Sequence, residues 1–486
     1  MKNKSRNIIL LILSIFIFSG LVYAGNIISN NANAYYQADN VTLNNTGVYY
    51  STSSDTKKLT KTADVVVCRG TSLLDDLIKS FTCDVVCKST NTECSTAINS
   101  KSSNNTYLFL SRGNYPIGSP INVYNNWKLQ GAGDGLVWLN KKAGYTGGNA
   151  DIIRLNEVIP FYNNVEISGV SLNGSLDDSV ATGVGININT VNNLNIHDIS
   201  IYSTSGYGMS LGCQGATNIY KNNTQVYNVK IIQPRSNKDA FGGGCLQDCD
   251  IHDIYIERNG AIGNGSFIDL TNRDGCVFSN LRFKGIGVIN NAVWGFSSDF
   301  NATNEVVTNL NMQNVWYGIF YGSGSGNINI NNVLINRTAE NGLSNGIFLS
   351  GDNSAVHDID FSNIHIINAN GSQYSFILKN TSNINIDGLT IKGISGYGVE
   401  FQTSSINNSL KNYIIDVPSF PIVIGNSWQT SGSSTYIQGY DYPYYTQVIN
   451  NTNFDPTLSV FNRQTIYNSS SACRSNGTAW KCWNMV

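Results

Sequence analysis

Residues 196–201 read IHDISI, residues 226–231 VYNVKI, residues 251–256 IHDIYI and residues 278–283 FSNLRF. Each stretch has apolar residues at its first, fourth and sixth positions and Asp or Asn at its third, which we call the pivot. The pattern, with Gly also allowed at the pivot, occurs ten times at intervals of about 27 residues, as solenoid repeats do. Only 41% of the chain is hydrophobic, so this regularity indicates a repeat fold. The pivots are Gly169, Asp198, Asn228, Asp253, Asn280, Asn314, Asn332, Asn363, Gly388 and Asn412.

Each repeat contains short strands of period two separated by Asn, Gly and Ser, with almost no helical periodicity. This predicts an all-β fold, a right-handed parallel β-helix of about ten to twelve rungs. Stacking rungs about 4.8 Å apart buries the apolar column and pairs the strand backbones. Asn, Asp and Gly suit a tight bend at the pivot because they accept left-handed backbone angles. We also expect stacked Asn side chains to hydrogen-bond from rung to rung.

Four segments are predicted along the chain. Residues 1–24 look like a secretory signal peptide, because Lys2, Lys4 and Arg6 precede an apolar run over residues 8–22. An uncleaved membrane anchor is the alternative for this run, and no second stretch of spanning length follows. Residues 25–95 are a polar lead-in and cap, residues 96–428 the β-helix, and residues 429–486 a Tyr-rich tail. We therefore expect a secreted, extracellular or cell-surface protein.

The ten cysteines fall into even groups, which fits disulfide pairing outside the cytosol. Cys249 and Cys276 each stand four residues before a pivot on neighbouring rungs, so we expect them to be bonded. Cys473 and Cys482 are expected to staple a small β element in the tail. Cys and His are scattered rather than clustered, so no metal site is predicted, and no motif supports Ca²⁺.

The low charge of the chain argues against two classes of partner. Charged residues make up 13% of the chain and the net charge is −2, so nothing indicates binding to nucleic acid or to an anionic membrane. Fourteen Asn-x-Ser/Thr triplets follow residue 24, which suggests a glycoprotein without identifying any one glycan site.

Residues 106–133, TYLFLSRGNYPIGSPINVYNNWKLQGAG, resemble the first rung of the pectin-lyase-like superfamily. With the repeats behind it, the resemblance covers roughly residues 96–428 and implies the parallel β-helix fold. The superfamily includes polysaccharide lyases, glycosidases, epimerases, tailspikes and adhesins, so the resemblance alone does not fix the activity. Trimers are common among its tailspike-like members, which leaves a homotrimer open.

Known catalytic motifs of that superfamily are missing. Polygalacturonases combine Asn-Thr-Asp, an Asp-Asp pair and Gly-His-Gly on successive rungs. This chain has no Gly-His-Gly, and its Asp177-Asp178 pair stands without those partners. The sequence also lacks a pectate-lyase pattern of calcium-binding aspartates.

Two outward columns beside the pivots predict a glycan-binding strip on one flat face. Sugars offer C–H faces to aromatic rings and hydroxyl or carboxylate groups to donors, so the strip suits an acidic or neutral glycan. Its Lys, Arg, Tyr and His side chains are also the types that could act as a lyase base. The alternative is an ordinary exposed surface, where Tyr and Trp are common and isolated basic residues keep strands soluble. The strip comprises His197, Tyr227, Lys230, His252, Tyr255, Arg282 and Trp316.

Asp239 and Asp269 are the candidate catalytic residues. Asp269 is expected to project outward from a second recurring strand, and Asp239 precedes the equivalent strand one rung earlier. Two neighbouring carboxyl groups can divide into a proton donor and a base or nucleophile. Residues 242–244 are all Gly, which predicts a bare surface beside the pair. The alternative is a solvated, salt-bridged turn that includes Glu257 and Arg258.

Two functions fit these features. The first is a secreted β-helix protein that binds, and by lyase or glycosidase chemistry cleaves, a polysaccharide. The second is a non-enzymatic structural or adhesive surface protein, such as a cell-envelope or viral spike. Missing motifs and abundant Asn-x-Ser/Thr triplets favour the second, and the two surface features favour the first.

Overall fold

The computed structural model describes the central coil and several isolated strands on either side. Predictions that fall on other residues, including the signal peptide of residues 1–24, lie outside the described part. The described residues are 63–80, 83–142, 145, 151–155, 162–174, 183–212, 221–233, 238–259, 265–286, 294–315, 317–336, 345–369, 374–393, 397–402, 405, 407–416 and 422–424, with strands at 40–44, 47–52, 55–58, 436–438, 447–448, 465–467, 471–475 and 480–484.

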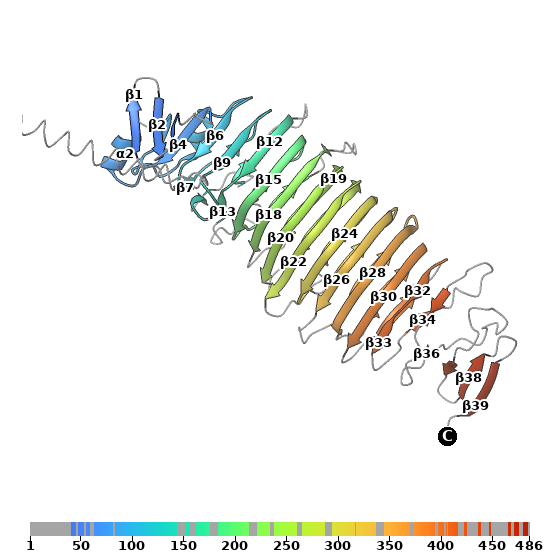
Figure 1. The fold of residues 1–486 in the computed structure, drawn as a ribbon. Coiled ribbons are helices and arrows are strands. Elements are labelled where there is room, and N and C mark those ends of the chain that lie inside the picture. The colour runs from blue at the N-terminus through green and yellow to red at the C-terminus, as the bar shows by residue number, and fades with distance from the viewer. Residues whose placement is uncertain are drawn as a thin grey trace, which may run out of the picture.

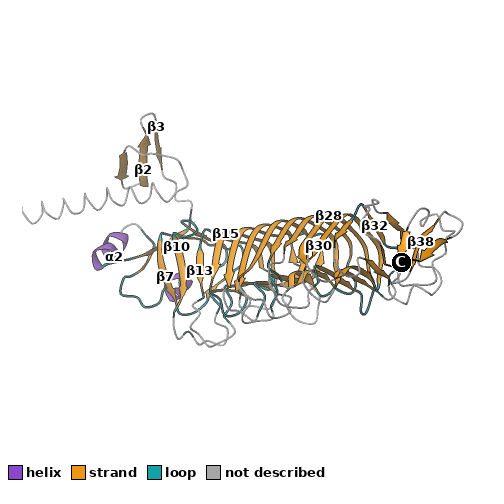
Figure 2. Cartoon of the chain, turned by 90° about the horizontal axis from the view of Figure 1, so that it is seen from below, coloured by secondary structure: helices purple, strands orange, loops and turns teal. Residues whose placement is uncertain are grey.

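The coil is a parallel solenoid in which each strand pairs with the equivalent strand one turn later (Figures 1 and 2). One column, the long-strand sheet, has about nine regular turns, slightly fewer than the ten to twelve predicted. The predicted all-β, right-handed parallel β-helix class is confirmed. The long strands are β12 (Tyr162–Ser168), β15 (Val191–Tyr202), β18 (Thr224–Gln233), β20 (Asp250–Asn259), β22 (Val277–Ile286), β24 (Ala302–Gln313), β26 (Gly326–Asn336), β28 (Val356–Ala369) and β30 (Thr381–Gly393).

A second column, the short-strand sheet, runs beside the first. Its members pair in parallel from turn to turn, as Phe241↔Ile268 and Ile268↔Phe296 illustrate. The short strands are β14 (Ile186–Asn187), β16 (Met209–Leu211), β19 (Phe241–Gln247), β21 (Ile268–Asp274), β23 (Trp294–Ser298), β25 (Tyr317–Tyr321), β27 (Ile347–Ser350), β29 (Tyr374–Lys379), β31 (Tyr397–Phe401) and β34 (Ile422–Ile424).

Each long strand bends at left-handed residues. In β15 the bends are at Asn193 and Asp198, both with φ of 54°. The pivot was predicted, whereas the bend five residues before it was not. Inward and outward positions change phase at the pivot, so Val226 and Val229, three residues apart, are both buried. A long strand therefore consists of straight segments that meet at bends.

The pivot side chains form ladders from turn to turn, as predicted. Asn309 Nδ2 donates to Asn280 Oδ1 at 3.0 Å, and Asn332 Nδ2 donates to Asn309 Oδ1 at 3.2 Å. Donation runs toward the earlier turn, so an Asp can accept from the next turn but cannot donate to the previous one. Asp198, which follows the glycine pivot Gly169, accepts from Asn228 Nδ2 at 2.5 Å in this way.

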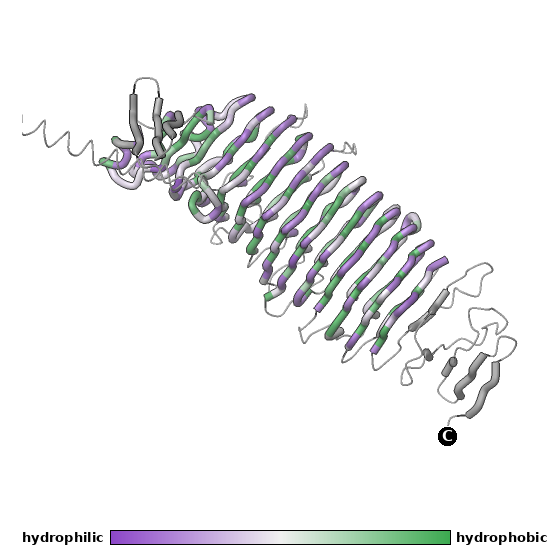
Figure 3. The backbone as a smooth tube through the Cα atoms, viewed as in Figure 1, coloured by the Kyte–Doolittle hydropathy of each residue, from purple (hydrophilic) through white to green (hydrophobic). Residues whose placement is uncertain are grey.

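Buried apolar residues form one continuous core inside the coil. Hydrophilic and hydrophobic residues alternate along the strands (Figure 3). At the position two residues before the pivot, successive turns bury Ile196, Val226, Ile251 and Phe278 completely. Burying each such side chain contributes about 1.5–3 kcal/mol. The stacked interior thus stabilises turns that could not fold alone.

The predicted register is wrong in one repeat. Leu281 pairs with Leu310 and Phe283 with Met312, so the pivot of that turn is Asn309 rather than Asn314. Both choices satisfy the pattern, because residues 307–312 read VTNLNM and residues 312–317 read MQNVWY. Periodicity could not separate two overlapping matches, whereas strand pairing does.

The N-terminal end combines short strands with two helices. Disulfides join Cys68 to Cys83 and Cys87 to Cys94. The elements are β4 (Val65–Arg69), α2 (Leu73–Ser80), β5 (Val85–Cys87) and α3 (Ser95–Asn99), and the first turns comprise β6 (Tyr107–Leu110), β7 (Gly113–Ile117), β8 (Ile121–Asn122), β9 (Lys128–Gly131), β10 (Val137–Lys141), β11 (Ile153–Arg154) and β13 (Ser171–Asn173).

Further strands complete the chain. In the tail, β38 and β39 are antiparallel with Cys473 directly opposite Cys482, while their disulfide stays a prediction. No described helix is long and apolar enough to span a bilayer. These strands are β1 (Asn40–Asn44), β2 (Gly47–Thr52), β3 (Asp55–Lys58), β17 (Lys221–Asn222), β32 (Ser409–Lys411), β33 (Ile414–Asp416), β35 (Tyr436–Gln438), β36 (Gln447–Val448), β37 (Thr465–Tyr467), β38 (Ser471–Ser475) and β39 (Trp480–Asn484).

Candidate functional site

Three aspartates gather on the outer face of the short-strand sheet, and we call them the acid cluster. Asp239 lies two residues before β19, Asp269 lies in β21 between the buried Ile268 and Leu270, and Asp299 follows β23. Gly242 pairs with Asp269, which places β19 and β21 side by side at this point. The predicted outward direction of Asp269 follows from this alternation.

Backbone contacts hold Asp239 in place. The Ser266 N–H donates to Asp239 Oδ1 at 2.6 Å. The Arg258 guanidinium, only 4% exposed, donates to the Lys238 carbonyl oxygen at 2.8 Å and to the carbonyl oxygens of Gly265 and Ser266. Arg258 therefore ties together the two chain segments that flank Asp239.

The alternative of a solvated salt-bridged turn does not describe this region. Arg258 is buried, donates to a carbonyl group, and its charge acts to lower the pKa of the Asp239 carboxyl. Glu257 lies on the other sheet, where it accepts from the Tyr255 hydroxyl at 2.6 Å and pairs with Lys284 at 3.3 Å.

Burial raises the pKa of all three acids in the cluster. Burial, followed by the negative charges of Asp239 and Asp299, raises the pKa of Asp269 to about 7. Desolvation also raises the pKa of Asp239 and of Asp299. Asp269 Oδ1 is buried without a hydrogen-bond partner, which is costly for an ionised carboxyl. Near neutral pH, Asp269 can thus carry a proton beside a second carboxyl group.

A tyrosine occupies the space that the three glycines were expected to leave bare. A Cβ at Gly242 would lie 2.6 Å from Tyr207 Cε1 and 3.1 Å from Asp239 Oδ2, so only Gly leaves room for this ring. Gly243 and Gly244 instead let the backbones of neighbouring turns approach closely. Burial and the charges of Asp239 and Asp269 raise the pKa of the Tyr207 hydroxyl.

Sequence reasoning missed Tyr207 because it lies in a loop. A usable signal existed, since Met209 pairs with Phe241 and both Tyr207 and Asp239 stand two residues before these partners. The phenol therefore occupies, one turn earlier, the position that Asp239 occupies in its own turn.

Four half-buried rings continue the same face beyond the acid cluster, and we call them the aromatic platform. Asp269 pairs with Ser297, Ser297 with Phe320, and Phe320 with Phe348. The platform consists of Trp294, Tyr317, Phe320 and Phe348, with centroid distances from Trp294 of 4.1, 4.7 and 6.3 Å to the other three in that order.

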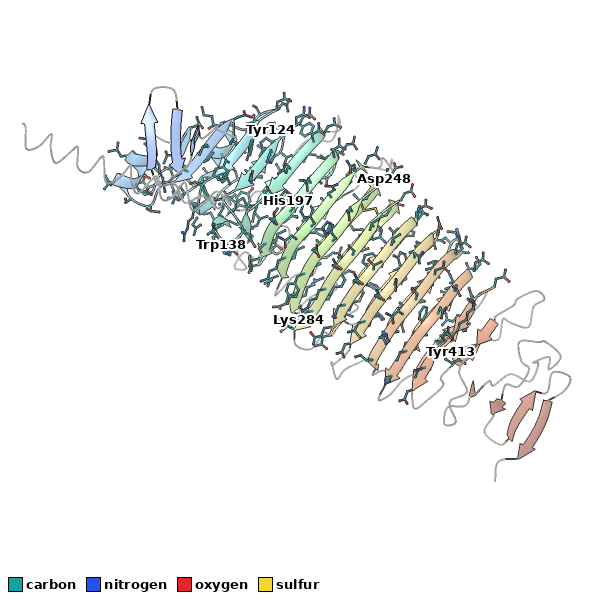
Figure 4. The ribbon with its side chains drawn as sticks, viewed as in Figure 1. Tyr124, Trp138, His197, Asp248, Lys284 and Tyr413 are labelled. Carbon is teal, nitrogen blue, oxygen red and sulfur yellow. A yellow bond between two sulfur atoms is a disulfide. The ribbon has the colours of Figure 1, made fainter. Side chains whose placement is uncertain are left out.

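The predicted strip lies on the long-strand sheet (Figure 4). Tyr227 stacks between His197 at 4.7 Å and His252 at 5.1 Å. In the other column, Lys230 pairs with Tyr255, and the Arg282 guanidinium lies 5.7 Å from the Tyr255 ring centroid. Most of these side chains already have partners within the sheet.

Two features of the strip differ from the prediction. A left-handed pivot separates the two columns in every turn, so they flank a bend rather than share a flat face. Arg282 pairs with Asn311, not with Trp316. Trp316 lies outside the described residues, and its inclusion followed from the incorrect register.

Three His-Asp pairs are part of the ladders. His197 Nδ1, His252 Nδ1 and His357 Nδ1 each lie 2.8 Å from Oδ2 of the following Asp. The other oxygen of each Asp accepts an Asn amide from the next turn. These carboxylates therefore serve the turn as well as the imidazole.

Disulfide and metal predictions can be compared directly with the structure. Cys249 and Cys276 are bonded as predicted, with a Cα–Cα distance of 4.4 Å. Within the described part of the chain, no group of three or more His, Cys, Asp and Glu side chains is placed to hold a metal ion.

Comparison with known proteins gives structural neighbours but no sequence relatives. No protein-family profile and no curated protein matches the chain. The A-module of mannuronan C-5 epimerase AlgE4 from Azotobacter vinelandii aligns with a TM-score of 0.51 at 15% identity, over 71% of this chain and 96% of that one. This chain shares the parallel β-helix fold of that module.

Two further β-helix neighbours align less closely. A family 28 exopolygalacturonase from Yersinia enterocolitica aligns with a TM-score of 0.45 at 9% identity, over 81% of this chain and 82% of that one. The pre-mature gene product 12 of bacteriophage phi29 aligns with a TM-score of 0.47 at 16% identity, over 74% of this chain and 54% of that one. At such identities the likeness concerns the fold alone.

Proposed function

We propose that this β-helix protein is secreted, binds a polysaccharide along its short-strand sheet and hydrolyses it at the acid cluster. The observation that carries the proposal is the placement of Asp269 on the strand beside Gly242, where burial raises its pKa to about 7, next to the hydrogen-bonded carboxyl of Asp239. Pairs of carboxyl groups in different environments perform acid and base chemistry on glycosidic bonds.

The two environments assign different roles to the two acids. Asp269 donates its proton to the leaving oxygen as the bond between that oxygen and the anomeric carbon breaks. Asp239, whose Oδ1 accepts the Ser266 N–H, is the base that takes a proton from the attacking water. Tyr207 lies beside Gly242, close enough for the charges of both carboxyl groups to raise its pKa, and it orients the sugar through its hydroxyl.

The aromatic platform supplies a binding surface next to this chemistry. Sugar C–H faces pack on aromatic rings, and Phe320 and Phe348 follow Asp269 and Ser297 in one outward column. A glycan bound there would run along the axis of the coil, with its cleaved bond at the acid cluster. The AlgE4 A-module, named as a mannuronan epimerase, is an example of polysaccharide chemistry on this fold.

A second candidate function is a non-enzymatic surface adhesin. It is favoured by the missing Gly-His-Gly motif and by a strip whose side chains are largely paired with one another. In that case the aromatic platform would bind glycans without cleaving them.

Purified protein incubated with a panel of neutral and uronate glycans separates the candidates. Reducing ends report hydrolysis, and ultraviolet absorbance of unsaturated ends reports lyase chemistry. We expect Asp269→Asn to lower hydrolysis at least about 100-fold, as loss of a general acid does, while Asp360→Asn, an exposed acid on β28, leaves it unchanged. Glycan binding with no product in either assay would support the non-enzymatic adhesin instead of the hydrolase.

Binding is tested separately on the two sheets. Trp294→Ala and Phe320→Ala should weaken glycan retention, whereas Tyr227→Ala and Tyr255→Ala on the long-strand sheet should not. The opposite result would assign binding to the strip.

A further inference from the structure

The helix α2 presents its apolar residues to solvent. Leu73, Leu74 and Leu77 are 76%, 59% and 56% exposed, the highest values among the large hydrophobic residues of the described chain. They stand at positions i, i+1 and i+4 and form one surface, which we call the leucine face. An exposed apolar cluster of this kind marks an interaction site.

Polar contacts fix this orientation. Asp76 is buried, and its carboxylate accepts from the Ser89 N–H at 2.8 Å and from the Ser89 hydroxyl at 2.7 Å. Lys79 Nζ donates to the Arg69 carbonyl oxygen at 2.5 Å and pairs with Asp75 at 2.9 Å. The Cys68–Cys83 disulfide closes the segment around the helix. The polar side of α2 is therefore anchored, and rotating the leucines inward would break these contacts.

The size of the leucine face argues against a free partner. A stable interface buries roughly 800 Å² on each partner and involves about 20–30 residues a side. Three leucines on one short helix fall far below that. A segment of the same chain needs much less, because a short tether holds it at an effective concentration in about the mM range.

One such segment precedes the helix. Strands β1, β2 and β3 form a three-stranded antiparallel sheet, which we call the N-terminal meander. Apolar residues stand at alternate positions, with Val41 opposite Tyr50 and Leu43 opposite Val48. Alternate positions of a strand share a face, and a small sheet needs its apolar face covered to be stable.

A short connection tethers the meander to the cap. Residues 59–64 join β3 to β4, and at about 3.5 Å per residue they span up to roughly 20 Å. We propose that the leucine face of α2 is the docking surface for the N-terminal meander of the same chain, which then forms an outer layer over the cap.

Limited trypsin digestion of the full chain tests this proposal at Lys57, Lys58 and Lys61. Combined Leu73→Ser, Leu74→Ser and Leu77→Ser substitutions should release the meander and speed cleavage there on the order of tenfold, because docked segments resist proteolysis. The matched control combines Val306→Ser and Ile414→Ser, which are exposed on the coil, and should change nothing. Unchanged cleavage in the leucine variant would overturn the proposal.

An engineered cross-link gives an independent measurement. Leu43→Cys with Leu74→Cys should form an intramolecular disulfide, whereas Thr42→Cys with Leu74→Cys, on the other face of β1, should not. Equal cross-linking of both pairs, or of neither, would contradict docking. If light scattering shows a dimer that the leucine variant no longer forms, the occupant of the leucine face is a second copy of the chain. If the wild type binds lipid vesicles and the leucine variant does not, the occupant is lipid. Either outcome rejects the meander.

Discussion

Arg273 and Glu305 form an ion pair inside the coil, with 2.6 Å between Nε and Oε1 and both side chains fully buried. The Tyr321 hydroxyl donates to Glu305 Oε2 at 3.0 Å, and the Arg273 guanidinium lies 4.9 and 5.0 Å from the ring centroids of Phe278 and Phe296. Arg273 belongs to the same strand as Asp269 but points to the other side of the sheet. The interior of the solenoid thus contains a charged pair on the strand that carries Asp269.

Replacing one partner of this ion pair should lower the free energy of unfolding more than replacing both. Glu305→Leu leaves the Arg273 charge buried without a counter-ion, and we expect it to lower the free energy of unfolding by about 3–5 kcal/mol. The double variant Arg273→Met with Glu305→Leu should recover most of that loss. Urea unfolding followed by circular dichroism measures both, and a double variant less stable than Glu305→Leu alone would contradict the argument.

Stability should depend on pH through Asp269. Its folded pKa is about 7 and its ordinary value is 3.8, so between these pH values the folded state keeps a proton that the unfolded state has lost. Stability from this group is therefore full below pH 3.8 and is lost as pH rises toward 7. Asp269→Asn should remove that loss. The free energy of unfolding of the variant minus that of the wild type should therefore be larger at pH 8 than at pH 5 by about 1–3 kcal/mol. Asp360→Asn is the control and should show the same difference at both pH values.

Charge should make the site favour neutral glycans over uronates. In the proposed site three carboxyl groups would face the ligand, while Arg258 donates to carbonyl groups and Arg273 is paired inside the coil. At pH 8 we expect a neutral glycan to bind about tenfold more tightly than the uronate of the same linkage, with the difference shrinking as salt increases. Calorimetric titration of matched pairs measures this. Tighter uronate binding would mean that the acid cluster does not face the ligand.

The pivots should tolerate Gly better than Ala. Asn309 has φ of 56° and makes two ladder hydrogen bonds. Asn309→Ala loses both and adds left-handed strain, for a cost of about 2–4 kcal/mol, whereas Asn309→Gly avoids the strain and should cost about 1–2 kcal/mol less. Asn314→Ala is the comparison: Asn314 also has a left-handed φ, of 59°, but its amide donates to the Gly285 carbonyl oxygen rather than to a pivot side chain, so this variant should lose less stability than Asn309→Ala in a thermal unfolding series. Equal losses from Gly and Ala at Asn309 would contradict the bend argument.

The fold was predictable because its stabilising residues recur. Inward positions such as Ile196 and Ile251 repeat with the turn, and left-handed bends select Asn, Asp or Gly at each pivot. Loops vary in length between turns, so spacing alone left Asn309 and Asn314 as competing matches. The resulting one-repeat shift then placed Trp316 beside Arg282 incorrectly.

The candidate site was harder to predict because it depends on contacts between segments. Asp239 and Asp269 could be placed one turn apart from the repeat of the short strands. The approach of Tyr207 to Gly242, the burial of Arg258 and the pairing of Arg273 with Glu305 depend on loop paths that no periodic pattern encodes. Outward aromatic residues such as Phe320 and Phe348 carried a signal, but only in the sheet that the pivot pattern does not mark.

The ladder of amides has a consequence for how this protein can change length. Where consecutive pivots are Asn, the side-chain amide of one turn donates to the carbonyl oxygen of the turn before it. Deleting one complete turn would join two turns whose inward and outward positions already match. Deleting half a turn would place apolar residues of the interior on the outer surface. Proteins with this fold should therefore differ in length by whole turns, and smaller changes in length should occur in the loops.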